Sequence, residues 1–169
     1  MLKKLSTLFL MAALLLSWTA KAQDTCDNYY GSLSSLPWSE DFESVGEEEI
    51  PACWTQVQMA TDANPCVNRL SSYAHNSVAL LSLWANNGNT NIIALPYFED
   101  LNGLQITFWA RQTSAPTHFS VGVIDNTGAY VPMDTIADLP SGYTEYTLNM
   151  SDYATYGSRP AFKNIGGCV

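Results

Sequence analysis

LQITFWAR, residues Leu104–Arg111, decides the fold class, because apolar and polar side chains alternate along its whole length. A period of two is typical of a β-strand with one face on the core and the other in solvent. Every second residue from Leu104 to Ala110 is apolar, which leaves Trp109 on the opposite face. We expect Trp109 to be an outward aromatic residue that contacts a ligand; the alternative is that it belongs to a second buried face.

Eight further segments have strand patterns and follow one another at a spacing of roughly ten residues, with turn residues between them. They are Trp38–Phe42, Cys53–Met59, Ser77–Trp84, Asn91–Leu95, Phe119–Ile124, Tyr130–Ile136, Tyr143–Met150 and Pro160–Ile165. Residues 60–76 lack periodicity and predict a long surface loop. Helical turns are expected only at Pro96–Leu101 and Ser151–Tyr156. This pattern predicts an all-β sandwich of two antiparallel sheets.

The first 22 residues predict a cleaved signal peptide. Lys3 and Lys4 precede the apolar run Leu5–Trp18, and Ala20-Lys21-Ala22 supplies small residues at the cleavage site. The run is shorter than the about 20 apolar residues that a membrane span needs. We expect export through the Sec pathway to the medium or the cell surface, with no membrane insertion after cleavage. The chain then divides into a signal peptide (1–22), a polar leader (23–35) and a β-domain (36–169).

The charge of the exported chain excludes several classes of partner. Cleavage would remove three of the seven basic residues, leaving four against 16 acidic ones and a formal net charge of −12. Binding to DNA or RNA depends on clustered Lys and Arg residues, which this chain lacks. We therefore expect no nucleic-acid partner, and anionic membrane surfaces are disfavoured for the same reason.

Four cysteines, Cys26, Cys53, Cys66 and Cys168, remain in the exported chain. An even number in an oxidising compartment favours two disulfides, which allow three pairings. One pairing joins Cys53 to Cys66 across a short loop and Cys26 to Cys168 near the two ends. Each bridge would contribute about 2–4 kcal/mol by restricting the unfolded chain.

Five motifs in order along the chain carry a family resemblance: LPWSEDFES, PACW, FWAR, HFSVGVIDNTGAYVPMDTI and YTEYTLNM. In this order they resemble the cleaved-adhesin or choice-of-anchor J domains, which are MAM-like jelly rolls of secreted and cell-surface Bacteroidetes proteins. The resemblance covers Leu36–Gly167. It implies a jelly-roll sandwich that binds host protein and holds structural calcium. Such domains usually continue into a last strand carrying an aspartate, whereas this sequence stops at Val169. Either the sequence is truncated at its C-terminus or the protein dispenses with that strand, and the sheet edge left behind would be exposed.

The resemblance places the calcium contacts on the segment Ser39-Glu40-Asp41-Phe42-Glu43. Asp41 and Glu43 are two residues apart, so on a strand they would share a face, whereas Glu40 would point the other way. Carboxylate oxygens are the ligands that calcium prefers. We expect Asp41 and Glu43 to bind calcium, with Glu40 as a further candidate; a solvated acidic edge is the alternative.

The residue types offer little support for catalysis. His75 and His118 belong to no HExxH motif, and the chain has neither a GxSxG motif nor a Gly-rich phosphate loop. The four cysteines are better explained by disulfides than by a nucleophile. We therefore expect that the protein is not an enzyme.

The sequence thus predicts a secreted or cell-surface adhesin-like module that recognises an extracellular protein or glycan, with structural calcium. One alternative is a carbohydrate-binding accessory or glycan-active secreted enzyme, because jelly rolls host such enzymes and paired carboxylates can hydrolyse glycosides. Another is a structural spacer with no ligand.

Overall fold

The computed structural model describes residues 37–59, 65–85, 89–98, 100–114, 118–137, 139–166 and 169. The predicted signal peptide, the polar leader, Cys26 and Cys168 lie outside these residues. All of the described strands pair in antiparallel sheets and no α-helix is present among the described residues, which confirms the all-β prediction. In this part of the chain no helix is long and apolar enough to cross a membrane.

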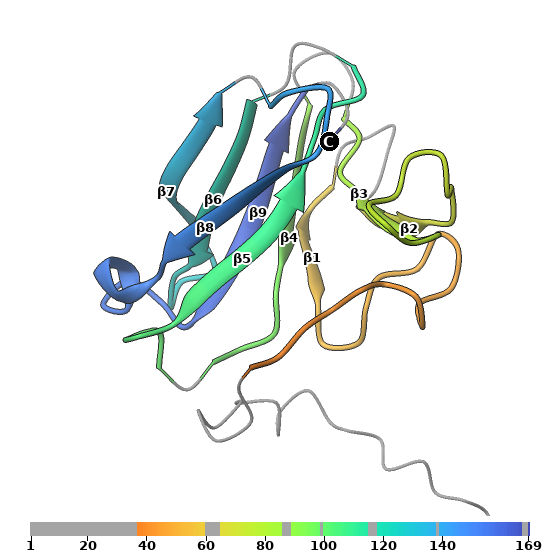
Figure 1. The fold of residues 1–169 in the computed structure, drawn as a ribbon. Coiled ribbons are helices and arrows are strands. Elements are labelled where there is room, and N and C mark those ends of the chain that lie inside the picture. The colour runs from red at the N-terminus through yellow and green to blue at the C-terminus, as the bar shows by residue number, and fades with distance from the viewer. Residues whose placement is uncertain are drawn as a thin grey trace, which may run out of the picture.

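A five-stranded sheet forms the back of the molecule (Figure 1). Its strands are β1 (Thr55–Gln58), β4 (Thr90–Ala94), β9 (Arg159–Ile165), β6 (His118–Ile124) and β7 (Tyr130–Ala137), in that spatial order. The three central strands are buried over most of their length, as expected for strands that have a neighbour on each side.

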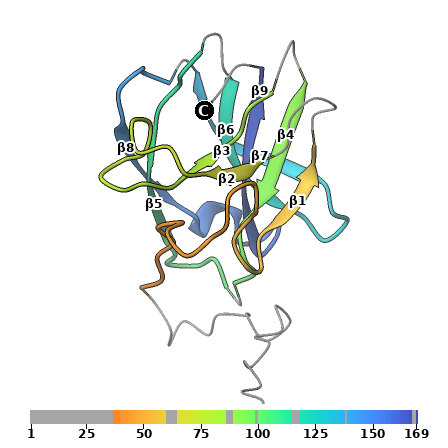
Figure 2. The same cartoon turned by 90° about the vertical axis from the view of Figure 1, so that its right-hand side faces the viewer.

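A two-stranded sheet lies in front of the back sheet (Figure 1). It consists of β5 (Gln105–Ala110) and β8 (Thr144–Asn149), with Gln105 opposite Asn149 and Ala110 opposite Thr144. A hairpin of β2 (Cys66–Asn68) and β3 (Leu80–Ser82) lies to the side of these two layers, and Figure 2 views the molecule from that side.

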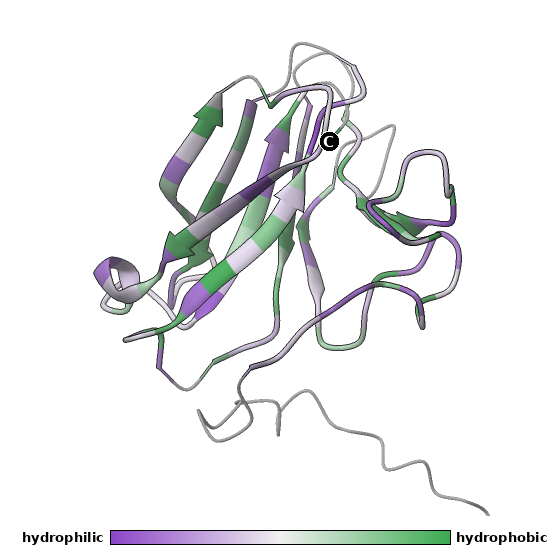
Figure 3. Ribbon diagram, in the orientation of Figure 1, coloured by the Kyte–Doolittle hydropathy of each residue, from purple (hydrophilic) through white to green (hydrophobic). Residues whose placement is uncertain are grey.

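Aromatic side chains join the two layers. Phe108 of β5 contacts Phe119 and Phe162 of the back sheet, with ring centroids 5.9 and 5.1 Å apart, and stacks on Tyr146 of β8 at 5.6 Å. The predicted alternation along β5 is confirmed: Ile106 and the other even-numbered residues face inward, and Figure 3 shows the alternating hydropathy of the strand. These contacts are the centre of the apolar core.

Two buried asparagines connect the back sheet to the segment that follows β3. Asn91 of β4 and Asn164 of β9 lie opposite each other in the sheet, and both are completely buried. The side-chain amide of Asn164 donates to the carbonyl of Leu83 at 2.5 Å, and that of Asn91 donates to the carbonyl of Trp84. The pair therefore fixes the end of β3 against the back sheet.

Three local predictions are wrong, each for a local reason. Residues 38–42 form no strand, because Phe42 has a φ of 64° and the Glu40 carboxylate accepts its backbone N–H at 2.7 Å. Cys66–Asn68 is a strand inside the predicted loop; it is too short to show a period. The described residues of the segment 96–101, which leave out residue 99, form no helical turn, whereas the turn predicted at Ser151 is confirmed as the 3-10 helix η3 (Ser151–Tyr153).

Cys53 is disulfide-bonded, but not to Cys66, so the predicted bridge between these two residues is wrong. The Sγ atom of Cys66 lies 3.8 Å from the side-chain amide of Asn68. Disulfides that involve Cys26 or Cys168 stay a prediction.

Gly122 offers a test of the packing of the back sheet. It lies at an irregularity in the pairing of β6 with β7, and a Cβ atom there would meet the backbone oxygen of Val131 at 2.3 Å and the Tyr130 ring at 2.7 Å. We expect Gly122→Ala to lower the free energy of unfolding by about 1–3 kcal/mol, because the neighbouring backbone must shift. Chemical denaturation would measure the loss.

Gly142→Ala is the matched control, since a Cβ atom at Gly142 has nothing within 4 Å. We expect its free energy of unfolding to stay within about 0.5 kcal/mol of the original value. Equal stability of the two variants would show that β6 and β7 do not pack as described.

Candidate binding cleft

A cleft of about 1400 Å³ opens between β5 and the β2–β3 hairpin. Three continuous runs of backbone line it: residues 37–43, 75–83 and 103–111. Consecutive residues of a strand point to opposite faces, so a cleft lined by every residue of β5 meets the edge of the strand. Its wall also includes the core residues Trp54, Leu83, Leu95, Phe98, Phe119 and Phe162. The cleft therefore reaches the apolar interior between the layers.

The outer edge of β5 has no hydrogen-bonded neighbour among the described residues, because β5 pairs only with β8. The N–H of Met150 donates to the carbonyl of Leu104 at 2.9 Å. This bond and the register assign the backbone groups of the even-numbered residues of β5 to the pairing with β8. The N–H and C=O groups of Gln105, Thr107 and Trp109 consequently point toward the cleft.

Trp109 lies on the outer face of β5 and is 46% exposed, as predicted, so the alternative of a second buried face is wrong. The ring of His75 stacks on it, with centroids 4.2 Å apart and an interplanar angle of 17°. His75 also contacts Tyr143, whose hydroxyl donates to the carbonyl of Tyr73 at 2.7 Å. Burial raises the pKa of Tyr143. These contacts hold the loop after β2 against one end of the front sheet.

Arg111 continues β5 at this end of the cleft. Its guanidinium carbon lies 5.2 Å from the Tyr73 ring centroid and 5.1 Å from that of Tyr143. Within the described residues, no carboxylate lies within ion-pair distance of Arg111. It is therefore a positive charge, held between two rings, at the rim of a cleft in an acidic protein.

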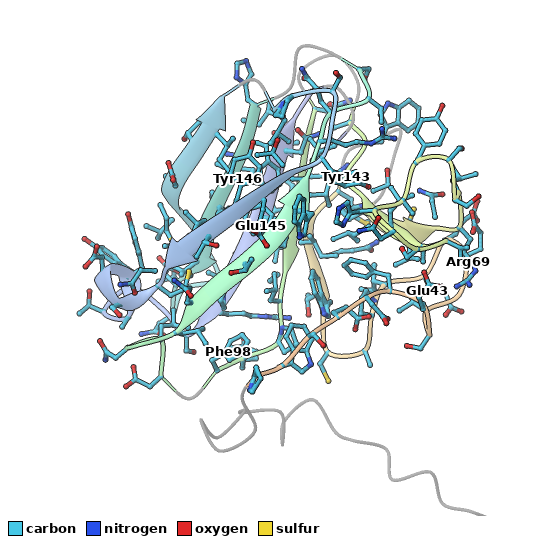
Figure 4. The ribbon with its side chains drawn as sticks, viewed as in Figure 1. Glu43, Arg69, Phe98, Tyr143, Glu145 and Tyr146 are labelled. Carbon is cyan, nitrogen blue, oxygen red and sulfur yellow. The ribbon has the colours of Figure 1, made fainter. Side chains whose placement is uncertain are left out.

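Glu43 fastens the acidic loop to the hairpin (Figure 4). Its Oε1 atom accepts the backbone N–H groups of Val78 and Ala79, both at 2.9 Å, and its Oε2 atom lies 3.4 Å from a guanidinium nitrogen of Arg69. The two backbone hydrogen bonds hold the pKa of Glu43 below its usual value of 4.5. Glu43 thus acts as an anchor between residues far apart in the sequence.

The predicted calcium ligands are not arranged as a calcium site. Both oxygens of Glu43 face donor groups, and one oxygen each of Asp41 and Glu40 accepts a nearby backbone N–H. In the described part of the chain, no group of three or more His, Cys, Asp or Glu residues could hold a metal ion. Calcium prefers six to eight oxygen ligands, and these residues do not fit that requirement as they lie. Structural calcium stays a prediction from the resemblance.

Sequence reasoning identified Trp109 but missed the residues around it. Tyr73 and His75 lie in the predicted surface loop, Arg111 is the last residue of one predicted strand, and Tyr143 is the first residue of another. Their contacts connect residues between 32 and 70 positions apart, which no local pattern contains. The only signal that the sequence offered was its large number of aromatic residues.

Neither a protein-family model nor a curated protein sequence matches this chain.

The role of Glu43 can be tested by pH. The pKa of Glu43 is lower in the folded protein than in the unfolded chain, where it is 4.5. The hydrogen bonds of the Glu43 carboxylate therefore stabilise the anchored state fully above pH 4.5. This stabilisation is lost as the pH falls through the pKa of Glu43 in the folded protein. We expect the hydrogen-exchange protection of the Val78 and Ala79 amides to fall over this acidic range. In Glu43→Gln, the protection should be low already at neutral pH.

Glu48→Gln is the control, because Glu48 is an exposed acidic residue of the same loop. Its protection factors at Val78 and Ala79 should match those of the original protein at every pH. NMR-detected exchange would measure them, and a Glu43→Gln variant that keeps full protection would contradict the anchoring role.

Proposed function

We propose that this protein is an extracellular binding module whose cleft between β3 and β5 recognises a partner by contact. The observation that carries the proposal is the cleft itself, which exposes a strand edge that no other described strand pairs with, above an aromatic core. A continuous apolar opening of this kind on a folded domain is typical of a binding site. The arginine at its rim adds a charge that can orient a partner.

We also propose that the sandwich is a jelly roll of the cleaved-adhesin type and that the chain is secreted or displayed at the cell surface. Two antiparallel layers and the non-sequential strand order β1-β4-β9-β6-β7 support the first part. The amino-terminal sequence pattern supports export.

A carbohydrate-binding accessory is a second candidate, favoured by the exposed ring of Trp109. Tryptophan and tyrosine rings can stack on sugars, and Tyr143 lies close by. Against this, His75 already covers one face of Trp109. A protein partner is therefore the better supported of the two.

The purified full chain should be tested against extracellular-matrix proteins, a glycan array and a panel of polysaccharides. We expect binding to at least one matrix protein, without turnover of any polysaccharide. Trp109→Ala should weaken binding about tenfold or more, as truncation of a central aromatic contact does.

Tyr156→Ala is the matched control, since Tyr156 is a similarly exposed aromatic residue that does not line the cleft. Its affinity should equal that of the original protein. Polysaccharide hydrolysis, or a complete absence of binding to the proteins and glycans, would overturn the proposed function.

A further inference from the structure

We propose that the partner enters the cleft as an extended polypeptide segment, which pairs with the outer edge of β5 and forms an added strand between β5 and β3. This inference rests on the proposed function and names the class of its partner. In strand addition, backbone hydrogen bonds supply affinity, and pockets for alternate side chains supply specificity.

The backbone of β5 offers the hydrogen bonds. Its even-numbered residues pair with β8, so Gln105, Thr107 and Trp109 present their N–H and C=O groups to the cleft. Their side chains are exposed on the outer face of the sheet and do not cover these groups. In Figure 1, β8 lies on one side of β5 and the β2–β3 hairpin on the other, and no described strand pairs with β5 on the side of the hairpin.

The edge of β3 faces the same cleft. Val67 of β2 exchanges backbone hydrogen bonds with residues 48 and 49, and it lies opposite Leu81. The backbone groups of Leu81 therefore point away from β2, on the side where the cleft is lined by residues 75–83. Two residues further on, beyond the end of β3, the N–H of Leu83 donates to the carbonyl of Val169 at 3.1 Å, so this edge already has a backbone partner there.

The wall of the cleft specifies the inward side chains of the added strand. Phe108, Phe119 and Phe162 lie at the cleft and belong to the apolar core, so alternate residues of the partner that face them should be apolar. Trp54 is 7% exposed at the same wall, and its buried indole N–H has no acceptor among the described residues. The indole N–H of Trp54 is therefore a buried donor whose hydrogen bond an acceptor of the partner could supply.

Charge complementarity predicts the charge of one side chain on the outer face of the partner segment. Arg111 is held between Tyr73 and Tyr143 at the end of β5 without an acidic partner in the described residues. An acidic residue on the outer face of the added strand would pair with it. The partner segment is thus extended, apolar at alternate positions, and acidic at one end.

The experiment begins with selection of peptides of about ten residues from a random display library on the immobilised full chain. The peptide enriched most often is synthesised, and each of its backbone nitrogens is methylated in turn. We expect methylation at alternate residues to weaken binding at least about tenfold, because only alternate N–H groups of an added strand meet β5. Bound peptide should also slow hydrogen exchange at the Thr107 and Trp109 amides.

Two proline variants make a matched pair. Thr107→Pro removes an N–H group that points into the cleft, and Thr147→Pro removes the equivalent group at the outer edge of β8. Both variants lose the contact between the Thr107 and Thr147 hydroxyls, which are 3.1 Å apart, so their stabilities should be similar. We expect Thr107→Pro to weaken peptide binding at least about tenfold and Thr147→Pro to leave it unchanged, with melting curves confirming that both fold.

Other outcomes would overturn the inference. They are the failure to enrich any peptide, a peptide insensitive to backbone methylation, and a Thr107→Pro variant that is folded and binds normally. Self-association that Thr107→Pro abolishes would identify a second copy of the chain as the occupant instead. If one of these outcomes is found and the protein still binds a matrix protein or a glycan, the proposed function holds but the partner does not bind by strand addition.

Discussion

The packing of Phe108 against Phe119 and Phe162 is the contact on which the sandwich depends. It joins a front sheet of only two strands to a back sheet of five, and it buries one face of β5 while the edge of that strand stays open. Aromatic pairs of this kind contribute more stability than the burial of their surface area alone, because their rings meet at tilted or edge-on angles. The same contact that holds the layers together therefore also forms the wall of the cleft.

The hairpin is held beside the layers by polar contacts at three places. Glu43 binds the backbone at Val78 and Ala79, Tyr143 binds the loop carbonyl at Tyr73, and buried asparagine amides bind the segment after β3. Two of these contacts lie on exposed surface, where polar contacts contribute little to stability. The side of the cleft formed by the loop after β2 is thus held by weaker contacts than the end of β3.

Much of the back sheet and of β5 could be predicted, because buried strands have a periodicity that the sequence shows directly. Residues 38–42 alternate in the same way but form a loop, since Glu40 and Asp41 bind nearby backbone N–H groups. The orientation of Trp109 followed from its strand. The residues around Trp109 could not be predicted from the sequence, because the stacking of His75 and the position of Arg111 depend on how a distant loop folds back.

The opposed pair Asn91 and Asn164 has a consequence for how the sheet aligns. The two residues lie directly across from each other, and in this register each side-chain amide reaches a backbone carbonyl of the segment after β3. A slip of one position between β4 and β9 would turn one of the amides to the opposite face of the sheet, away from its carbonyl acceptor and toward the apolar side chains of Ile92 and Ala161, where an unsatisfied polar group is costly. The two asparagines therefore penalise a one-residue misalignment of β4 and β9 during folding, since an amide would then lose its carbonyl acceptor.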